Sequence, residues 1–140
     1  TGARVTLITD GDIAGVIATT DPETGIDLYI CVGGAPEGVL AAAALRCIGG
    51  QMQGSLVTQS DEQKARAAKM GVKDFNKKFE LNEMASGDVI FAATGVTDGW
   101  LLDGIHHVHG GVSTHTIVMR SATGTVRRLK SFHYSTDKFK

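Results

Sequence analysis

Two acidic motifs in this sequence combine carboxylates with glycines, a pairing suited to binding cations and sugars. The first is Asp10-Gly11-Asp12 and the second is Gly33-Gly34-Ala35-Pro36-Glu37. Ionised carboxylates accept hydrogen bonds from sugar hydroxyls and coordinate hard divalent metals. Glu37 stands just inside a predicted helix N-terminus, which also attracts phosphate, so a cation between carboxylate and phosphate would suit both. Each motif also has a plainer interpretation, as a helix cap for the first and as compensation of the helix dipole for Glu37.

Other candidate residues have weaker patterns. His106-His107-Val108-His109 resembles a metal cluster, but no cysteine or carboxylate is near in sequence, which favours structural or exposed histidines. Arg127, Arg128 and Lys130 could contact phosphate, although a charged edge strand explains them as well. Trp100 suits a core or lid anchor better than a stacking platform. The sequence contains no P-loop, GxGxxG, GxSxG or HExxH motif.

The hydrophobic pattern predicts the elements that must position the two acidic motifs. We expect strands at residues 5–8, 28–32 and 88–93, of which 28–32 is apolar enough to be buried in a sheet. Asp10-Gly11-Asp12 would lead from the first strand into a short helix. Two glycines would end the second strand with a sharp turn, before a helix over residues 36–47 that has Pro36 in its first position.

The remaining pattern predicts a weak strand over 51–57, a helix over 61–70, a helical turn over 81–85 and a hairpin of residues 112–120 and 124–133. Alternating strands and helices indicate an α/β domain with a mixed β-sheet flanked by helices. Ligands on such sheets bind at the carboxyl ends of parallel strands. We therefore expect the loops at 10–12, 33–37 and 94–99 to form one site.

Composition limits the class of protein. The 140 residues are enough for one domain, and a net charge of −1 argues against a nucleic-acid partner. No apolar run approaches the length of a membrane span. Cys31 and Cys47 lie in apolar stretches, so we expect buried free thiols in a reducing cytoplasm. Because the chain starts without Met and enters a strand almost at once, we expect it to be part of a longer protein.

Several motifs together carry a family resemblance. Asp10-Gly11-Asp12-Ile13-Ala14, Val32-Gly33-Gly34-Ala35-Pro36-Glu37-Gly38-Val39 and Ala92-Ala93-Thr94-Gly95-Val96-Thr97-Asp98-Gly99 occur in that order, followed by Thr114-His115-Thr116. Over essentially its whole length the chain resembles the C-terminal half of class II fructose-1,6-bisphosphatases, bacterial enzymes of which some relatives also accept sedoheptulose 1,7-bisphosphate. The resemblance implies the lithium-sensitive sugar phosphatase fold. Residues 1–140 would then be the single α/β C-terminal domain of a two-domain enzyme whose N-terminal half is absent.

The resemblance also implies roles for particular residues. Glu37 corresponds to the metal ligand that this half contributes, and Asp10, Gly11, Asp12 and Gly34 correspond to residues that hold the sugar bisphosphate. The other metal carboxylates and an arginine-containing substrate loop belong to the upstream half. The residue that activates water therefore stays unknown, and we expect the 140-residue chain alone to be inactive.

The implied activity is metal-dependent hydrolysis of fructose 1,6-bisphosphate to fructose 6-phosphate and phosphate, a step of gluconeogenesis, with Mn²⁺ or Mg²⁺ as cofactor. The resemblance is to cytoplasmic enzymes, and a homo-oligomer is left open. Two alternatives from other classes remain. One is a non-catalytic module that binds a sugar phosphate or a nucleotide, which the small number of carboxylates would suit. The other is a structural domain whose edge strand assembles an oligomer.

Overall fold

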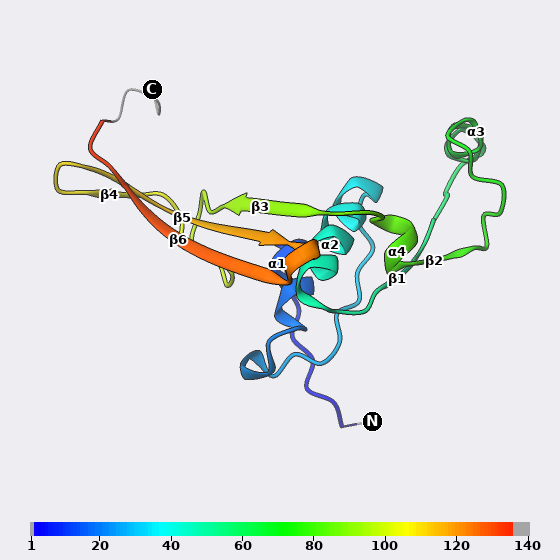
Figure 1. The fold of residues 1–140 in the computed structure, drawn as a ribbon. Coiled ribbons are helices and arrows are strands. Elements are labelled where there is room, and N and C mark those ends of the chain that lie inside the picture. Colours follow the sequence, from blue (N-terminus) through cyan, green and yellow to red (C-terminus); the bar gives the residue numbers. More distant parts are fainter. Residues whose placement is uncertain (1, 136–140) are drawn as a thin grey trace.

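The computed structural model describes residues 2–135 of the chain. Three helical elements come first, helices and strands then alternate over residues 35–94, and a long antiparallel hairpin ends the described part of the chain (Figure 1). In chain order the elements are α1 (Asp12–Ala18), η1 (Pro22–Thr24), α2 (Ala35–Ile48), β1 (Gln53–Ser55), α3 (Asp61–Lys69), β2 (Lys78–Glu80), α4 (Leu81–Met84), β3 (Ile90–Thr94), β4 (His106–Val108), β5 (Gly111–Arg120), η2 (Ser121–Thr123) and β6 (Thr125–His133).

The larger sheet is built around β5. This ten-residue strand pairs with β6 along one edge and with β3 and β4 along the other. A second, smaller sheet consists of β1 and β2. Every strand pair among the described residues is antiparallel. The predicted combination of a β-sheet flanked by helices is confirmed, but the predicted mixed sheet with parallel strands is wrong.

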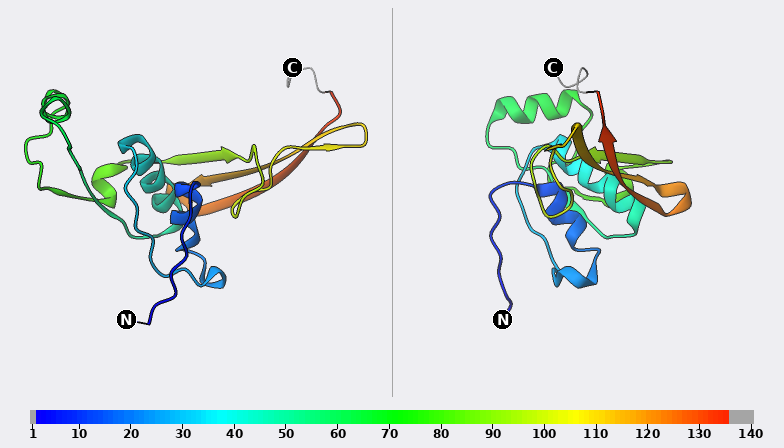
Figure 2. Two further views of the ribbon diagram at one scale, coloured as in Figure 1. Left: turned by 180° about the vertical axis from the view of Figure 1, so that it is seen from behind. Right: turned by 90° about the vertical axis from the view of Figure 1, so that its left-hand side faces the viewer.

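The core lies between the larger sheet and two helices. Ile17 of α1 and Ala44 of α2 pack with Ile117 and Met119 of β5, and all four are buried. Alanines in α2 let the helix approach the sheet closely, since they bring little side-chain volume between the two. Figure 2 shows both helices beneath one face of the sheet. The main buried core of the described residues is therefore the sandwich of α1 and α2 against β3, β5 and β6.

Helix α2 matches its prediction closely. It starts with Pro36 in the first turn, continues through the alanine run and stops at Gly49, whose φ of 92° lies in the left-handed region that glycine tolerates. Cys47 on this helix is buried, and burial raises the pKa of its thiol. Cys31 is free but exposed, so the prediction that both thiols are buried is wrong for Cys31.

The two N-terminal strands that the sequence predicts are not formed as strands. Residues 5–8 and 28–32 are extended, but neither joins a ladder within the described part of the chain. Apolar β-branched residues favour extended backbone, whereas a strand also needs a neighbouring strand whose N–H and C=O groups pair with its own. The described residues supply no such neighbour.

Two arms extend from the central sandwich in opposite directions. The β4 end of the hairpin projects at one end, and α3 is held at the other end beyond β1 and β2 (Figures 1 and 2). Ser60 caps α3 by accepting a hydrogen bond from the Gln63 N–H, as its spacing predicts, and α3 buries none of its residues. None of the helices in residues 2–135 combines the length and the apolarity that a membrane crossing needs.

Candidate functional site

An open hollow of about 1360 Å³ contains most of the second acidic motif and one aspartate of the first. Asp12 at the start of α1 lines it, together with Gly33, Gly34 and Glu37 at the start of α2. The opposite wall comes from β1 and α4. The chain thus brings two carboxylates that are far apart in sequence to one surface depression.

A tyrosine holds Asp12 in this hollow. The Tyr29 hydroxyl donates a 2.7 Å hydrogen bond to Asp12 Oδ1. Burial raises the pKa of Tyr29, and the hydrogen bond to Asp12 raises it further, so the hydroxyl stays a donor at neutral pH. The other carboxylate oxygen of Asp12 lies over Gly33, where a Cβ would come within 3.3 Å of it. Tyr29 therefore orients Asp12 toward the glycine turn.

Glu37 folds back over the same turn. Its carboxylate lies so close to Gly34 that a side chain at that position would have to displace the end of the Glu37 side chain. Gly34 has φ −69° and ψ 149°, which other residues adopt freely, so the predicted sharp turn does not explain this glycine. What the structure shows at this glycine is the Glu37 carboxylate, which takes up the space that a Cβ would fill. Among the described residues no side chain caps the N-terminus of α2, and the first residues of this helix line the hollow.

The first motif is only partly in the hollow. Gly11 precedes α1 with a φ of 78°, a left-handed conformation that a side chain would strain. Asp10 is exposed and does not line the hollow, and neither does Gly11. The plainer interpretation of this motif as a helix cap is confirmed in position, because Gly11 is the N-cap residue of α1, although its cap has no side-chain hydrogen bond.

The loop at 94–99 does not join the other two. None of its residues lines the hollow. Asp98 in this loop instead accepts hydrogen bonds from the Gly104 N–H and from His106, both at 2.8 Å. The hydrogen bond from Gly104 has the larger effect and that from His106 the smaller, and together they hold the pKa of Asp98 below its usual range. The prediction of three loops at one edge is therefore wrong for 94–99, because it assumed parallel strands ending at a common edge.

Three of the remaining candidates, His106, Arg128 and Lys130, have structural partners. His106 binds Asp98, which agrees with the structural interpretation of the histidines. Arg128 of the edge strand β6 donates a 2.8 Å hydrogen bond to the Leu101 carbonyl, and Lys130 lies 3.7 Å from Asp103. Lysine and arginine on this edge strand agree with the predicted charged edge.

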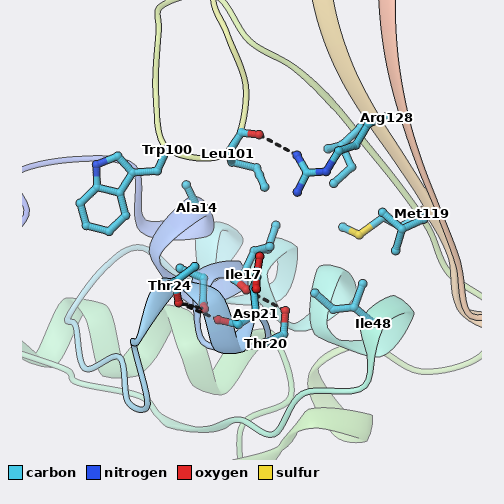
Figure 3. Close-up of a pocket in the computed structure, with 13 residues that line it drawn as sticks. Ala14, Ile17, Thr20, Asp21, Thr24, Ile48, Trp100, Leu101, Met119 and Arg128 are labelled. Atoms are coloured by element: carbon cyan, nitrogen blue, oxygen red, sulfur yellow. Dashed lines mark hydrogen bonds between the residues drawn. The ribbon is translucent and has the colours of Figure 1, made fainter.

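A second, smaller cavity of about 280 Å³ lies on the other side of α1 (Figure 3). Trp100 and Leu101 stand at its rim, opposite Asp21 and Thr24, and core residues such as Met119 form its floor. Trp100 is well exposed, so it covers this cavity from outside rather than filling the core. The acidic motifs do not reach this cavity.

A metal site within this chain would be incomplete. In residues 2–135, no group of three or more histidine, cysteine, aspartate or glutamate side chains is placed to hold a metal ion. Divalent cations of this kind need about six oxygen ligands, several of them carboxylates or waters. Asp12 and Glu37 could supply only part of such a set. The sequence did not reveal Tyr29, although a tyrosine in an apolar strand usually has a hydrogen-bond partner.

Comparison with known sequences places the chain among sugar bisphosphatases. Residues 1–133 match the family described as "Bacterial fructose-1,6-bisphosphatase, glpX-encoded". The match spans nearly the whole chain and includes both acidic motifs. The chain therefore belongs to this family, and the resemblance found in the sequence is confirmed.

Individual relatives narrow the comparison. The chain is 41% identical over 145 residues to the "D-fructose 1,6-bisphosphatase class 2/sedoheptulose 1,7-bisphosphatase" of Synechococcus sp. (strain JA-3-3Ab), and 39% identical to the protein of the same name from Synechocystis sp. (strain ATCC 27184 / PCC 6803 / Kazusa). Each match covers 94% of this chain. It covers only 42% of the relative, so the chain spans less than half the length of these curated relatives.

Proposed function

We propose that this chain is the C-terminal domain of a two-domain class II fructose-1,6-bisphosphatase and supplies part of its substrate and metal site. The family match over residues 1–133 carries the proposal, and the meeting of Asp12 and Glu37 in one hollow supports it. The reaction would be hydrolysis of fructose 1,6-bisphosphate to fructose 6-phosphate and phosphate. The names of the Synechococcus and Synechocystis proteins add sedoheptulose 1,7-bisphosphate as a second substrate to test.

The sugar would bind at the first motif and the glycine turn. Asp12, oriented by Tyr29, would accept hydrogen bonds from sugar hydroxyls. Asp10 and Gly11 would extend this contact, and the uncapped N–H groups at the start of α2, beside Gly34, would face a phosphate. These residues bind and orient the substrate, and the residue that activates water is assigned to the other domain.

Glu37 would be the one metal ligand from this chain. Its exposed carboxylate lies in the hollow beside an uncapped helix start, where the chain leaves an oxygen ligand free. A bound Mn²⁺ or Mg²⁺ supplies charge neutralisation at the phosphoryl group and a lowered pKa for bound water. The other ligands would come from the N-terminal half, within the lithium-sensitive phosphatase fold. A cytoplasmic location, suggested by two free thiols, and assembly into a homo-oligomer belong to the same proposal.

A replacement chimera tests the proposal directly. In this chimera the matched part of the Synechococcus JA-3-3Ab relative is exchanged for residues 1–140 of the present chain. We expect the chimera to release phosphate from fructose 1,6-bisphosphate with Mn²⁺ or Mg²⁺, whereas the purified 140-residue chain alone releases none. Hydrolysis of fructose 1,6-bisphosphate by the chain alone would contradict the proposal that its metal site is incomplete.

A non-catalytic sugar-phosphate module is the second candidate, favoured by the lack of a three-ligand metal cluster in the described residues. Circular dichroism and sedimentation would first establish that the chimera is folded. A folded chimera that binds fructose 1,6-bisphosphate by calorimetry but never hydrolyses it would support this second candidate and overturn the first.

A further inference from the structure

Two extended segments expose a row of apolar side chains. Val5 and Leu7 in the first segment and Leu28, Ile30 and Val32 in the second are between 73% and 91% exposed. We call these five residues the open strand face. Side chains at alternate positions of extended backbone point the same way, so each segment presents one uncovered apolar side. Monomeric proteins rarely leave such a row uncovered, and one that persists marks a surface for another polypeptide.

The opposite side of the same segments is already covered. Tyr29 and Ile8 lie against Gly15 of α1, so close that a Cβ at Gly15 would come within 2.7 Å of the Tyr29 ring and 3.2 Å of Ile8 Cδ1. Residues 28–32 are apolar at every position. Such a continuous run is typical of a strand buried on both faces, whereas a strand with one wet face alternates apolar and polar residues. The composition therefore requires a cover on the side where this structure has none.

The backbone of the two segments is also unpaired. No hydrogen bond joins the main chain of residues 3–8 or 27–32 to the main chain of another residue in the described part of the protein. Exposed N–H and C=O groups along extended backbone are a template for an added strand. An occupant that supplies both β-strand pairing and apolar side chains would satisfy the backbone and the side chains together.

We propose that the remainder of the family-length protein covers the open strand face with an apolar, strand-forming segment. More than half of each matched relative lies outside the part that this chain resembles, so each relative carries a domain-sized partner for this part within one polypeptide. Arg4 and Asp27 are the charged residues within 2–8 and 26–33, which leaves little to attract a nucleic acid or a charged peptide. The proposal rests on family membership and not on catalytic activity.

Covering this face would also fix the functional hollow. The first segment runs into Asp10-Gly11-Asp12, and the second runs into Gly33 and the start of α2. Pairing both segments with a partner would hold the two acidic motifs in place at the ends of ordered strands. Leu28, Ile30 and Val32 also line the hollow, so the same docking would bring the partner's residues to its wall, and within residues 2–135 the metal site there lacks ligands.

Hydrogen exchange on the chain alone and on the replacement chimera tests the proposal without any activity measurement. We expect the amides of residues 3–8 and 27–32 to exchange at least about tenfold more slowly in the chimera than in the chain alone, since their hydrogen bonds form only in the chimera. Amides of β5 should be protected equally in both and show that both are folded. Equal, fast exchange of the two segments in both proteins, with β5 protected, would overturn the proposal.

Matched substitutions locate the contact. Val32→Thr should lower the melting temperature of the chimera but not that of the chain alone, and Ile30→Lys should do so more strongly. The controls are Val96→Thr and Ile90→Lys, which change exposed apolar residues outside the open strand face. Equal effects of test and control variants would contradict the proposal. A dimer of the chain alone that protects 27–32 and dissociates with Ile30→Lys would assign the face to a second copy instead.

Discussion

The sheet region and the site-bearing region of this molecule are stabilised very differently. In the sheet region, β5 is paired along both edges and buries Val112, Ile117 and Met119. In the site-bearing region, the segments that lead to Asp12 and Glu37 pair with no strand among residues 2–135 and expose most of their apolar side chains. The chain thus stabilises its scaffold by itself, whereas the residues suited to chemistry stand on backbone that needs a partner. Each prediction below tests this difference.

The largest expected effect is in the scaffold. Ile117→Ala should destabilise the 140-residue chain by about 2–5 kcal/mol, because it leaves a cavity in the core. The matched change in the site-bearing region, Ile30→Ala, should stay within about 0.5 kcal/mol in the same chain, since this side chain is exposed. Urea unfolding of both variants measures the contrast. Similar losses would mean that the two regions are equally self-supporting.

The next effect concerns Glu37 in the replacement chimera. Glu37→Gln should lower kcat/KM about 10²–10³-fold, or ~2.7–4 kcal/mol, because a misplaced cation no longer stabilises the transition state. The melting temperature should hardly change. The control is Glu62→Gln, which alters a glutamate in the first turn of α3, away from the hollow. If Glu37 only complements the helix dipole, its removal would instead cost about 0.3–1 kcal/mol of stability and leave turnover intact.

The two aspartates should separate substrate binding from metal binding. Asp10→Ala and Asp12→Ala in the chimera should each raise KM about tenfold to a hundredfold, since a hydrogen bond to a charged group is worth ~1.5–3 kcal/mol. The Mn²⁺ concentration for half-maximal activity should stay close to that of the parent. A large rise in the Mn²⁺ requirement at unchanged KM would reassign the pair to metal coordination. A smaller effect of Asp10 would agree with its place outside the hollow.

Tyr29 should have a smaller effect, because it acts through Asp12. Tyr29→Phe in the chimera removes the hydrogen bond to Asp12 Oδ1 and should raise KM by a factor corresponding to about 0.5–1.5 kcal/mol, with kcat unchanged. In an Asp12→Ala background, the same change should have no further effect on KM. Additive effects would show that Tyr29 contributes only to packing.

The smallest effect should come from pH in the sheet region. Since the folded pKa of Asp98 is lowered by the Gly104 N–H and by His106, its stabilising contribution is complete above the ordinary carboxyl pKa, near pH 4. That contribution disappears as the pH falls through the lower folded value. Hydrogen exchange of Gly104 at about pH 6 should therefore be faster in Asp98→Asn than in the parent. An unchanged rate in the variant would contradict the role of Asp98.

Sequence patterns predicted the elements whose stability is local. The alanine run of α2, the cap of α3 and the alternation of the β5–β6 hairpin each depend on neighbouring residues, and each element was predicted correctly to within a few positions. The strands at 5–8 and 28–32 were not found. The apolar composition of these segments suits strands buried in a complete sheet. Whether they pair depends on neighbouring strands, which a local sequence pattern does not reveal.

The site shows the same division. The meeting of Asp12 and Glu37 could be predicted, because both follow apolar extended segments with glycine turns. The loop at 94–99 was misplaced, since the antiparallel order of β3 and β5 directs it elsewhere. The role of Gly34 was predicted for the wrong reason. Its φ and ψ suit other residues as well, and the structure instead shows the Glu37 carboxylate, three residues further along the chain, in the space that a side chain would fill.

The arm that carries α3 has a practical consequence for protein engineering. In the β1–β2 ladder Ser55 lies opposite Lys78, so the chain leaves and re-enters the body at neighbouring points. Helix α3, which lies between these two points, has no buried residue. The entropy cost of closing a loop depends only weakly on its length, so a shorter connection should be tolerated. Residues 56–77 can therefore be replaced by a short turn, or interrupted by a fluorescent domain, while the sandwich of α1 and α2 against the larger sheet stays intact.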